Sequence, residues 1–296
     1  MEQLLSFCQE ASIPPEQAAF FAEAYGALQR TGGADVLEEA LRTYFSTPAQ
    51  RAPEAVDKIA HIADEAGIHI LTLNALFVIR GFISIREAYI QKYGEEIYRA
   101  TAGDLSYKIN ECIGTDEVIG ITAISWSHLL LRETIFMLGR LQFHIVPFPY
   151  EIYEANGYTV RKDEPIIKIH IPSAGKLTEE LCFDAYRRAY RFFKDQFKGD
   201  VIPFMCSSWM LYERNSEFFP EGGNLARFMT DFDIIENKEI VDFPDLWRVF
   251  GKRYTDFTEL PRDNRLRNAM ADYLLAGNRM GYGIGFFFHD GKNIIK

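Results

Sequence analysis

The chain has 296 residues, of which 48% are hydrophobic and 25% charged, and its formal net charge is −10 at pH 7. This composition excludes a disordered chain and is typical of a soluble globular protein long enough for two ordinary domains. The negative charge argues against a nucleic-acid-binding protein, because neutralising phosphates requires clustered Lys and Arg, and the basic residues here are interspersed with acids.

The four cysteines, Cys8, Cys112, Cys182 and Cys206, are scattered without the paired spacing of zinc ligands or of a disulfide framework. We therefore expect reduced thiols, no bound metal and a cytoplasmic protein. The N-terminus carries acids where a secretory signal carries bases, and the longest apolar run, near residues 68–79, is too short to span a bilayer. We expect a soluble protein with no membrane partner.

Helical patterns fill the first part of the chain, up to about residue 135. Apolar residues recur at helical spacing over about residues 16–31, 36–45, 53–66, 71–79, 85–93, 95–113 and 126–137. On the last of these segments, His128, Arg132 and Glu133 fall close together on one face. We interpret them as a solvent-facing charged surface with one ion pair.

The pattern changes to β at Gly139, which predicts a helical domain over residues 1–138 and a second domain over residues 139–296. Here Arg140, Gln142 and His144 alternate with apolar residues, so the strand has one polar face. That face is a candidate substrate-binding surface, and the alternative is the solvent-facing side of an edge strand. Further on, Asn156-Gly157 predicts a β-hairpin.

Residues 165–197 predict a strand, a loop and a helix in succession. Ile166–Ile171 alternates β-branched with ionisable residues, and Thr178 is a good N-cap for a helix with one apolar face. Backbone N–H groups at such a helix start lack intrahelical partners and favour a phosphate group, although a single glycine also fits an ordinary loop. The candidate phosphate-binding residues are Ser173, Ala174, Gly175 and Lys176.

The remaining sequence adds strands and short helices. Phe204–Tyr212 predicts a strand parallel to the one before, because a helical crossover joins them. Leu225–Ile235 predicts another strand, Leu246–Phe250 and Arg265–Leu275 predict helices, and Gly281–Phe288 predicts a glycine-rich strand.

An ordered set of short motifs resembles a known family over nearly the whole chain. The motifs are Gly139-Arg-Leu-Gln-Phe143, Ile169-His-Ile-Pro172, Cys206-x-Ser208-Trp209, Asn224-x3-Phe228, Trp247-Arg-Val-Phe250, Leu260-Pro and Asp272-Tyr-Leu-x-Ala-Gly277. The set resembles bacterial proteins that pair an N-acyltransferase N-terminal domain with a GNAT-like C-terminal domain. The resemblance implies an α+β chain, with an all-helical domain followed by a GNAT-like mixed α/β domain. It also implies acyl transfer from a thioester such as acyl-CoA to an amine of a small molecule.

The resemblance also implies a position for the CoA pyrophosphate. GNAT enzymes bind it through a loop of the form Arg or Gln, two residues, Gly, one residue, Gly or Ala, placed between the central strand and a helix. Pro172–Lys176 holds that position with a single glycine. Asn278–Gly283 matches the glycine spacing better but follows a helix and precedes a strand.

Acyl transfer needs a base for the amine and donors for the developing oxyanion. His170 is the candidate base, Cys206 and Ser207 are candidate nucleophile or donor, and Trp209 is a candidate pocket wall. Each has a structural alternative: a hydrogen-bonded histidine, a buried thiol and hydroxyl, and a core tryptophan.

Two other functions stay open on the sequence. One is a catalytically silent protein of the same fold that binds a small polar molecule. The other is a thiol or serine hydrolase, which ranks last because the chain has no nucleophile elbow. The sequence does not indicate an oligomeric state.

Overall fold

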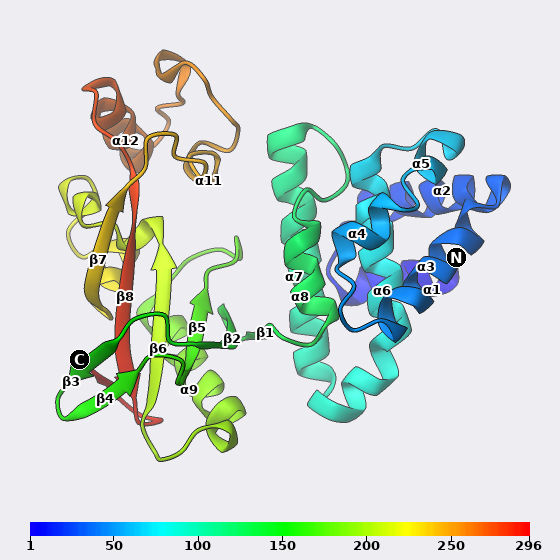
Figure 1. Ribbon diagram of the computed structural model, residues 1–296. Helices are drawn as coiled ribbons and strands as arrows, with labels where there is room; N and C mark the ends of the chain where they lie inside the picture. The colour runs from blue at the N-terminus through cyan, green and yellow to red at the C-terminus, as the bar shows by residue number, and fades with distance from the viewer. The chain divides into compact units, whose positions relative to one another are not determined.

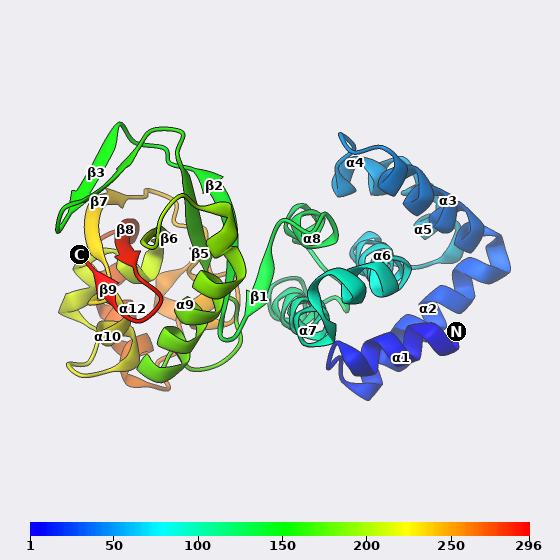
Figure 2. The same cartoon turned by 90° about the horizontal axis from the view of Figure 1, so that it is seen from below.

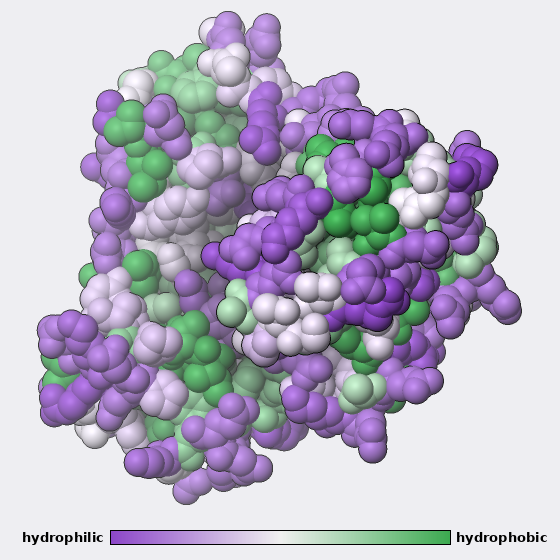
Figure 3. Space-filling model, turned by 45° about the vertical axis from the view of Figure 1, so that its right-hand side comes forward, coloured by the Kyte–Doolittle hydropathy of each residue, from purple (hydrophilic) through white to green (hydrophobic).

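The computed structural model describes all 296 residues and divides into two compact units, Met1–Met137 and Leu138–Lys296. The division lies beside the domain boundary predicted at residues 138 and 139. No helix combines the length and the apolar character needed to cross a membrane. Hydrophilic side chains cover much of the face drawn in Figure 3, with smaller apolar patches between them.

The first unit is built of helices (Figure 1). They are α1 (Glu2–Glu10), α2 (Pro15–Thr31), α3 (Gly33–Ser46), α4 (Ala52–Asp57), α5 (His61–Ala66), α6 (Ile70–Tyr93), α7 (Glu95–Asp116) and α8 (Ile124–Leu131). Figure 2 shows α6 among the other helices of the unit, and its side chains from Leu73 to Ile79 are almost entirely buried. This part of the helix is apolar nearly all round, as expected for a segment that is covered on all sides.

Four helix predictions in this unit are wrong in their bounds, and the helix predicted over 53–66 is two helices, α4 and α5. The helices predicted at 71–79 and 85–93 are one helix, α6, which continues through Gly81. A Cβ at Gly81 would lie 3.0 Å from Leu131 Cδ2, so the glycine permits the close approach of α8. The helix predicted to reach residue 137 ends at Leu131, because Glu133 has φ 54° and leaves the helical region.

The predicted charged surface at the end of α8 is half-buried instead, and its side chains bond to other parts of the unit. The Arg132 guanidinium donates from Nη2 to the carbonyl oxygens of Tyr44, Thr47 and Gln50 at 2.7, 2.9 and 3.0 Å. Its Cζ also lies 4.0 Å from the centroid of the Tyr44 ring. Arg132 therefore fixes the chain between α3 and α4, and the ion pair of this region joins Glu133 to Lys92 at 2.7 Å.

The second unit contains a mixed sheet with the strand order β1-β2-β5-β6-β8-β7, and β1 spans the boundary between the units. The strands are β1 (Phe136–Leu138), β2 (Leu141–Pro147), β5 (Pro165–His170), β6 (Ile202–Ser208), β7 (Asp233–Glu239), β8 (Gly281–His289) and β9 (Ile294–Ile295), with β3 (Ile152–Ala155) and β4 (Tyr158–Arg161) forming a separate hairpin. The helices are α9 (Glu179–Phe193), α10 (Asn224–Met229), α11 (Trp247–Phe250) and α12 (Arg265–Leu275), and the 3-10 turns are η1 (Lys194–Gln196), η2 (Trp209–Leu211), η3 (Glu213–Glu217) and η4 (Phe257–Glu259).

Helix α9 packs on one face of this sheet (Figure 2). Its Tyr186 ring lies 5.1 Å from the Phe287 ring and 6.3 Å from the Phe204 ring, measured between centroids. The other face is covered in part by the β3-β4 hairpin, whose Tyr153 ring packs on Phe286. The two faces therefore carry different residues of each strand, because side chains alternate along a strand.

Several predictions for this unit are confirmed. The hairpin turns at Asn156-Gly157, β5 and β6 are parallel, and Thr178 Oγ1 accepts from Leu181 N at the start of α9. The strand predicted over 225–235 is wrong, since α10 occupies its first part and β7 begins at Asp233. There the helical spacing places Arg227 Nη1 2.8 Å from Asp231 Oδ1. The α+β fold class is confirmed.

Candidate active site

The parallel strands β5 and β6 part at their carboxyl ends. Their paired residues end with Ile169 opposite Cys206. Beyond this point β5 remains paired with β2 through His170, and β6 remains paired with β8 through Ser208. Ligands of open α/β sheets commonly bind outside the carboxyl ends of parallel strands. The parting of β5 from β6 is therefore the first candidate for a binding site.

Polar residues gather on one face of the sheet beside this parting. Gln142 lies opposite His170 and His144 opposite Lys168, so all four side chains share one face. The His144 and His170 rings are 4.8 Å apart between centroids. Ser207 falls on the same face of β6, because Met205 pairs with Lys168 and Ser207 is two residues further on. The structure thus brings together four predicted residues, Gln142, His144, His170 and Ser207.

On this polar face, Gln142 Nε2 and His144 Nε2 are buried and have no hydrogen-bond partner. Gln142 is only 1% exposed, and an unmade bond at such a depth costs free energy. Burial, followed by the nearby positive charge of Lys168, lowers the pKa of His144 to about 4, so its imidazole is neutral at pH 7. A polar ligand that bonds these nitrogens would recover the missing interactions.

Cys206 lies on the opposite face of the sheet. It pairs with Ile169, shares the face that α9 covers, and is 1% exposed. Burial raises the pKa of the thiol to about 12, so the reactive thiolate is absent at neutral pH. The structure does not bring Cys206 to His170, and a nucleophilic Cys-His pair has no geometric basis here.

Trp209 also lies away from the polar face. It begins η2 instead of continuing β6, and its side chain is 5% exposed within an apolar cluster that includes Phe219 and Met280. Its place in this cluster is that of a core residue.

Arg140 is directed at the loop between β5 and α9. Its Nη2, Nη1 and Nε donate to the carbonyl oxygens of Gly175, Pro172 and Lys176 at 2.7, 3.0 and 3.1 Å. The residue precedes β2 and is 8% exposed, so it does not extend the polar strand face as the alternation predicted. Nothing local in the sequence links this arginine to a loop so far along the chain.

The residues of this loop suit an anionic group. Gly175 has φ +91°, which favours glycine, and no atom lies within 4 Å of the position that a Cβ would occupy. Ser173 and Lys176 are exposed, and Lys176 adds a positive charge beside the start of α9. The carbonyl groups of Pro172, Gly175 and Lys176 are turned toward Arg140.

The structure contains no group of three or more His, Cys, Asp or Glu side chains arranged to hold a metal ion.

Solved structures of acyltransferases share this fold. One is described as an acyltransferase in complex with decanoyl-CoA, and another as an acyltransferase in complex with decanoyl-CoA and teicoplanin. Each has 18% sequence identity and a TM-score of 0.73, over 97% of this chain and 87% of the other. A third, an acyltransferase mutant in complex with octanoyl-CoA, has the same identity and a TM-score of 0.72. At this identity the likeness shows the fold alone.

Curated protein sequences give no match to the chain. A family comparison matches residues 135–287, just over half of the chain, to the GNAT-like C-terminal domain. The matched segment contains β5, the loop after it, α9 and β6, which form the candidate site. By this match the protein belongs to the GNAT-like C-terminal domain family.

Proposed function

We propose that this protein is an acyl-CoA-dependent N-acyltransferase that moves an acyl group to an amine of a small molecule. The observation that carries the proposal is the parallel pair β5 and β6, which parts after Ile169 and Cys206 beside a polar sheet face and the loop before α9. The solved acyltransferases of the same fold are described with octanoyl-CoA, decanoyl-CoA and CoA, which supports a CoA thioester as the donor.

In the proposed reaction the amine nitrogen attacks the thioester carbonyl carbon. A C–N bond forms, the C–S bond breaks, the amine loses a proton to a base, and the departing CoA thiolate takes up a proton. His170 is proposed as the base, because it lies on the polar face at the end of β5. Ser207 is proposed as a hydroxyl donor to the developing oxyanion, since it is on the same face of β6 and is exposed.

Gln142 and His144 are proposed to bind the acceptor. Both carry buried nitrogens without a partner, and a neutral His144 can donate to or accept from an uncharged polar group. Because His144 contacts the His170 ring, an acceptor bonded to it would lie beside the proposed base.

The loop of Ser173, Ala174, Gly175 and Lys176 is proposed to bind the CoA pyrophosphate. Arg140 acts on it as a positioning residue, through three bonds to loop carbonyls. We also propose that residues 139–296 form the GNAT-like catalytic domain and residues 1–138 an N-acyltransferase-type domain.

A turnover assay tests the proposal. The purified chain is mixed with acetyl-, octanoyl- or decanoyl-CoA and a panel of amines, and release of the CoA thiol is followed. We expect amine-dependent release with at least one acyl-CoA, together with a rise in melting temperature on adding that acyl-CoA. A rise with free metabolites but with no thioester, and no turnover, would contradict the proposal and support the silent binding protein.

The role of His170 has a matched control. For His170→Ala we expect kcat to fall about 10²-fold or more, the usual contribution of a positioned base. His61→Ala, at an exposed histidine on α5, should leave kcat unchanged. If His170→Ala keeps the wild-type kcat and melting temperature, His170 is not the base.

A further inference from the structure

The polar face of the sheet also carries a positive charge, on Lys168 of β5. The residue lies opposite His144 of β2 and is half-buried. Its ammonium group makes no hydrogen bond and no ion pair within the chain. A charge that is partly withdrawn from water is normally paired, so Lys168 lacks a negative partner.

An unpartnered buried amide lies diagonally across from this charge. Gln142 is 1% exposed, and its Nε2 has no hydrogen-bond partner. It pairs with His170, two residues beyond Lys168 on β5, so Gln142 and Lys168 are diagonal neighbours on one face. Diagonal neighbours are about 7–8 Å apart at the backbone, which long side chains can bridge. One small group can therefore contact both nitrogens.

The strand positions around these two donors supply no negative charge. The positions of the same face on either side are apolar, Val146 on β2, Ile166 on β5 and Met205 on β6. The acidic strand residues that share the face, Asp233 and Glu236, are on β7, three strands away from β5. Apolar surroundings strengthen a hydrogen bond or ion pair made there, because the local dielectric constant is low.

Two N–H donors without an acceptor call for a ligand that brings oxygen atoms. The Gln142 amide nitrogen and the Lys168 ammonium group are both donors, and the second one is charged. A carboxylate has two acceptor oxygens and the opposite charge, so it satisfies both residues at once. An uncharged carbonyl group would leave the charge of Lys168 unpaired.

His144 is left for an uncharged part of the same ligand. Its imidazole is neutral at pH 7, and its Nε2 is buried without a partner. Its ring lies 4.8 Å from the ring of His170, the proposed base. Because His144 is also opposite Lys168, an amine at His144 and a carboxylate at Lys168 would be separated by the length of an amino acid.

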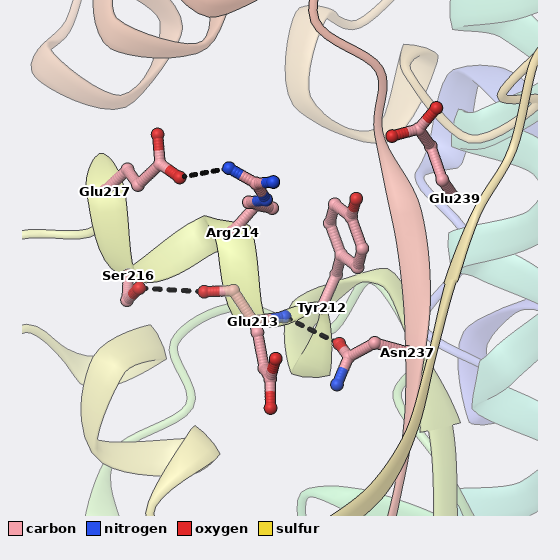
Figure 4. Close-up of a pocket in the computed structure, with 7 residues that line it drawn as sticks. All are labelled: Tyr212, Glu213, Arg214, Ser216, Glu217, Asn237 and Glu239. Carbon is pink, nitrogen blue, oxygen red and sulfur yellow. Dashed lines mark hydrogen bonds and ion pairs between the residues drawn. The ribbon is translucent and has the colours of Figure 1, made fainter.

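The pocket in Figure 4 lacks these properties. Its guanidinium, on Arg214, is already paired with Glu217 at 3.2 Å, and its lining also includes Glu213 and Glu239. A carboxylate ligand would therefore meet more negative than positive charge there. Arg214 is for this reason a suitable control residue for Lys168.

We propose that the acceptor is an amino acid or another amine that carries a carboxylate, and that Lys168 Nζ and Gln142 Nε2 bind this carboxylate. The amine then lies at His144, beside His170. The inference rests on the proposed acyl transfer and specifies its acceptor, and it makes Lys168 a specificity-determining residue.

The test compares amines that differ in the carboxylate. L-alanine is matched with ethylamine and L-phenylalanine with phenethylamine, and L-phenylalaninamide keeps the carbonyl group without the charge. Release of the CoA thiol from acetyl- and octanoyl-CoA is followed, and kcat/KM is expressed per neutral amine. We expect at least one amino acid to exceed its matched amine about ten-fold or more, as for a charge-assisted contact. The amide should resemble phenethylamine.

A binding measurement separates this inference from acyl transfer. Ligand-observed NMR without acyl-CoA should show saturable binding of an amino acid and weaker binding of its matched amine. If the amines release CoA but neither amino acid exceeds its matched amine, the carboxylate site is overturned while acyl transfer stands. If no amine releases CoA, acyl transfer fails, and the NMR result alone decides the carboxylate site: saturable amino-acid binding supports it, and its absence overturns it.

Variants assign the selectivity to its residues. In Lys168→Met the preference for the amino acid should fall to within about two-fold of none, and in Gln142→Met it should fall about three-fold. Lys168→Arg should keep most of the preference, because it keeps the charge. Arg214→Gln, which removes a paired charge outside the polar face, should leave it unchanged.

The melting temperature of Lys168→Met should equal or exceed that of the wild type, because the ammonium group has no partner to lose. A lost preference at an unchanged melting temperature is therefore a loss of binding and not of folding. A Lys168→Met protein with the wild-type preference would show that the carboxylate is not bound here.

Discussion

Arg140 contributes to the candidate active site from outside its polar face. One buried guanidinium holds three carbonyl oxygens of the loop before α9, so the shape of the loop depends on a residue at the other end of the β2 to β5 segment. A guanidinium can do this because it carries N–H donors on three nitrogens in one plane, whereas a lysine offers one nitrogen.

Replacing Arg140 by Lys should therefore weaken CoA binding through the pyrophosphate. We expect the dissociation constant of octanoyl-CoA to rise about ten-fold, as for the loss of roughly 1.4 kcal/mol. The dissociation constant of octanoyl-pantetheine, which has no pyrophosphate, should change less than two-fold. Calorimetry measures both, and Arg191→Lys on the exposed side of α9 is the control. An equal loss for both ligands would show that the loop does not hold the pyrophosphate.

For Cys206 we expect a substitution to change stability and not activity. Its thiol is buried against α9 with a pKa raised to about 12, so it packs and does not react. Cys206→Ala should keep kcat within about two-fold while lowering the free energy of unfolding by about 1–2 kcal/mol, the effect of a small cavity. A loss of turnover at an unchanged melting temperature would restore Cys206 as a catalytic candidate.

His289 makes stability depend on pH. It is fully buried, and its Nδ1 accepts from Gly291 N at 2.9 Å, so protonation would break this bond. Burial lowers the pKa of His289 from 6.5 to about 4. Between these values the unfolded chain binds more protons than the folded chain, so stability should fall as the pH is lowered from about 6.5 to 4.

We expect His289 to account for about 1–2 kcal/mol of the difference in unfolding free energy between pH 7 and pH 5. Urea unfolding of the wild type and His289→Asn at both pH values measures it. The variant should show a smaller difference. An equal difference in both proteins would mean that His289 is not the responsible group.

At the scale of elements, glycines set how closely neighbouring segments approach. Gly81 lets α8 pack on α6, and Gly283 lets η2 cross β8, since a Cβ at Gly283 would overlap the carbonyl group of Leu211. The glycine-rich pattern of 281–285 predicted a strand, and the structure supplies its reason: η2 and Phe232 lie directly over the backbone of these residues.

Gly283→Ala should accordingly displace η2 and destabilise the fold by about 3 kcal/mol, at the upper end of overpacking effects. Thermal and urea unfolding measure the change. Gly26→Ala within α2 is the matched control, because its nearest neighbour is the flexible Arg30 side chain at 3.5 Å. The control should be neutral or stabilising by up to about 1 kcal/mol. Similar behaviour of the two variants would contradict the close approach of η2.

At the scale of the whole molecule, the match to the GNAT-like family covers residues 135–287, and the likeness to solved acyltransferases covers 97% of the chain. We nevertheless expect acyl-CoA to contact only a small part of the chain. Amide hydrogen exchange with and without octanoyl-CoA should slow mainly in residues 173–178 and 207–211, because these segments follow the parting of β5 and β6. Protection confined to Met1–Met137 would contradict the proposed donor site.

Much of this architecture was readable from local patterns. Alternation along 165–171, the N-cap at Thr178 and the turn at Asn156-Gly157 all describe neighbours in sequence, and the structure confirms them. The wrong strand prediction at 225–235 has a physical cause as well. A short amphipathic segment fits the period of a helix as well as that of a strand. The contact of Arg227 with Asp231 appears only once the helix has formed.

Periodicity and capping were enough to predict a helical first part, the change to β patterns at Gly139 and the strand, loop and helix of 165–197, because these depend on residues a few positions apart. The α+β class was implied by the resemblance to a known family. The partners of Arg140 and the separation of Cys206 from His170 came only with the folded chain. Each depends on strand register or on contacts between residues distant in sequence, and a shift of one residue in the register of β5 and β6 would place His170 or Cys206 on the other face.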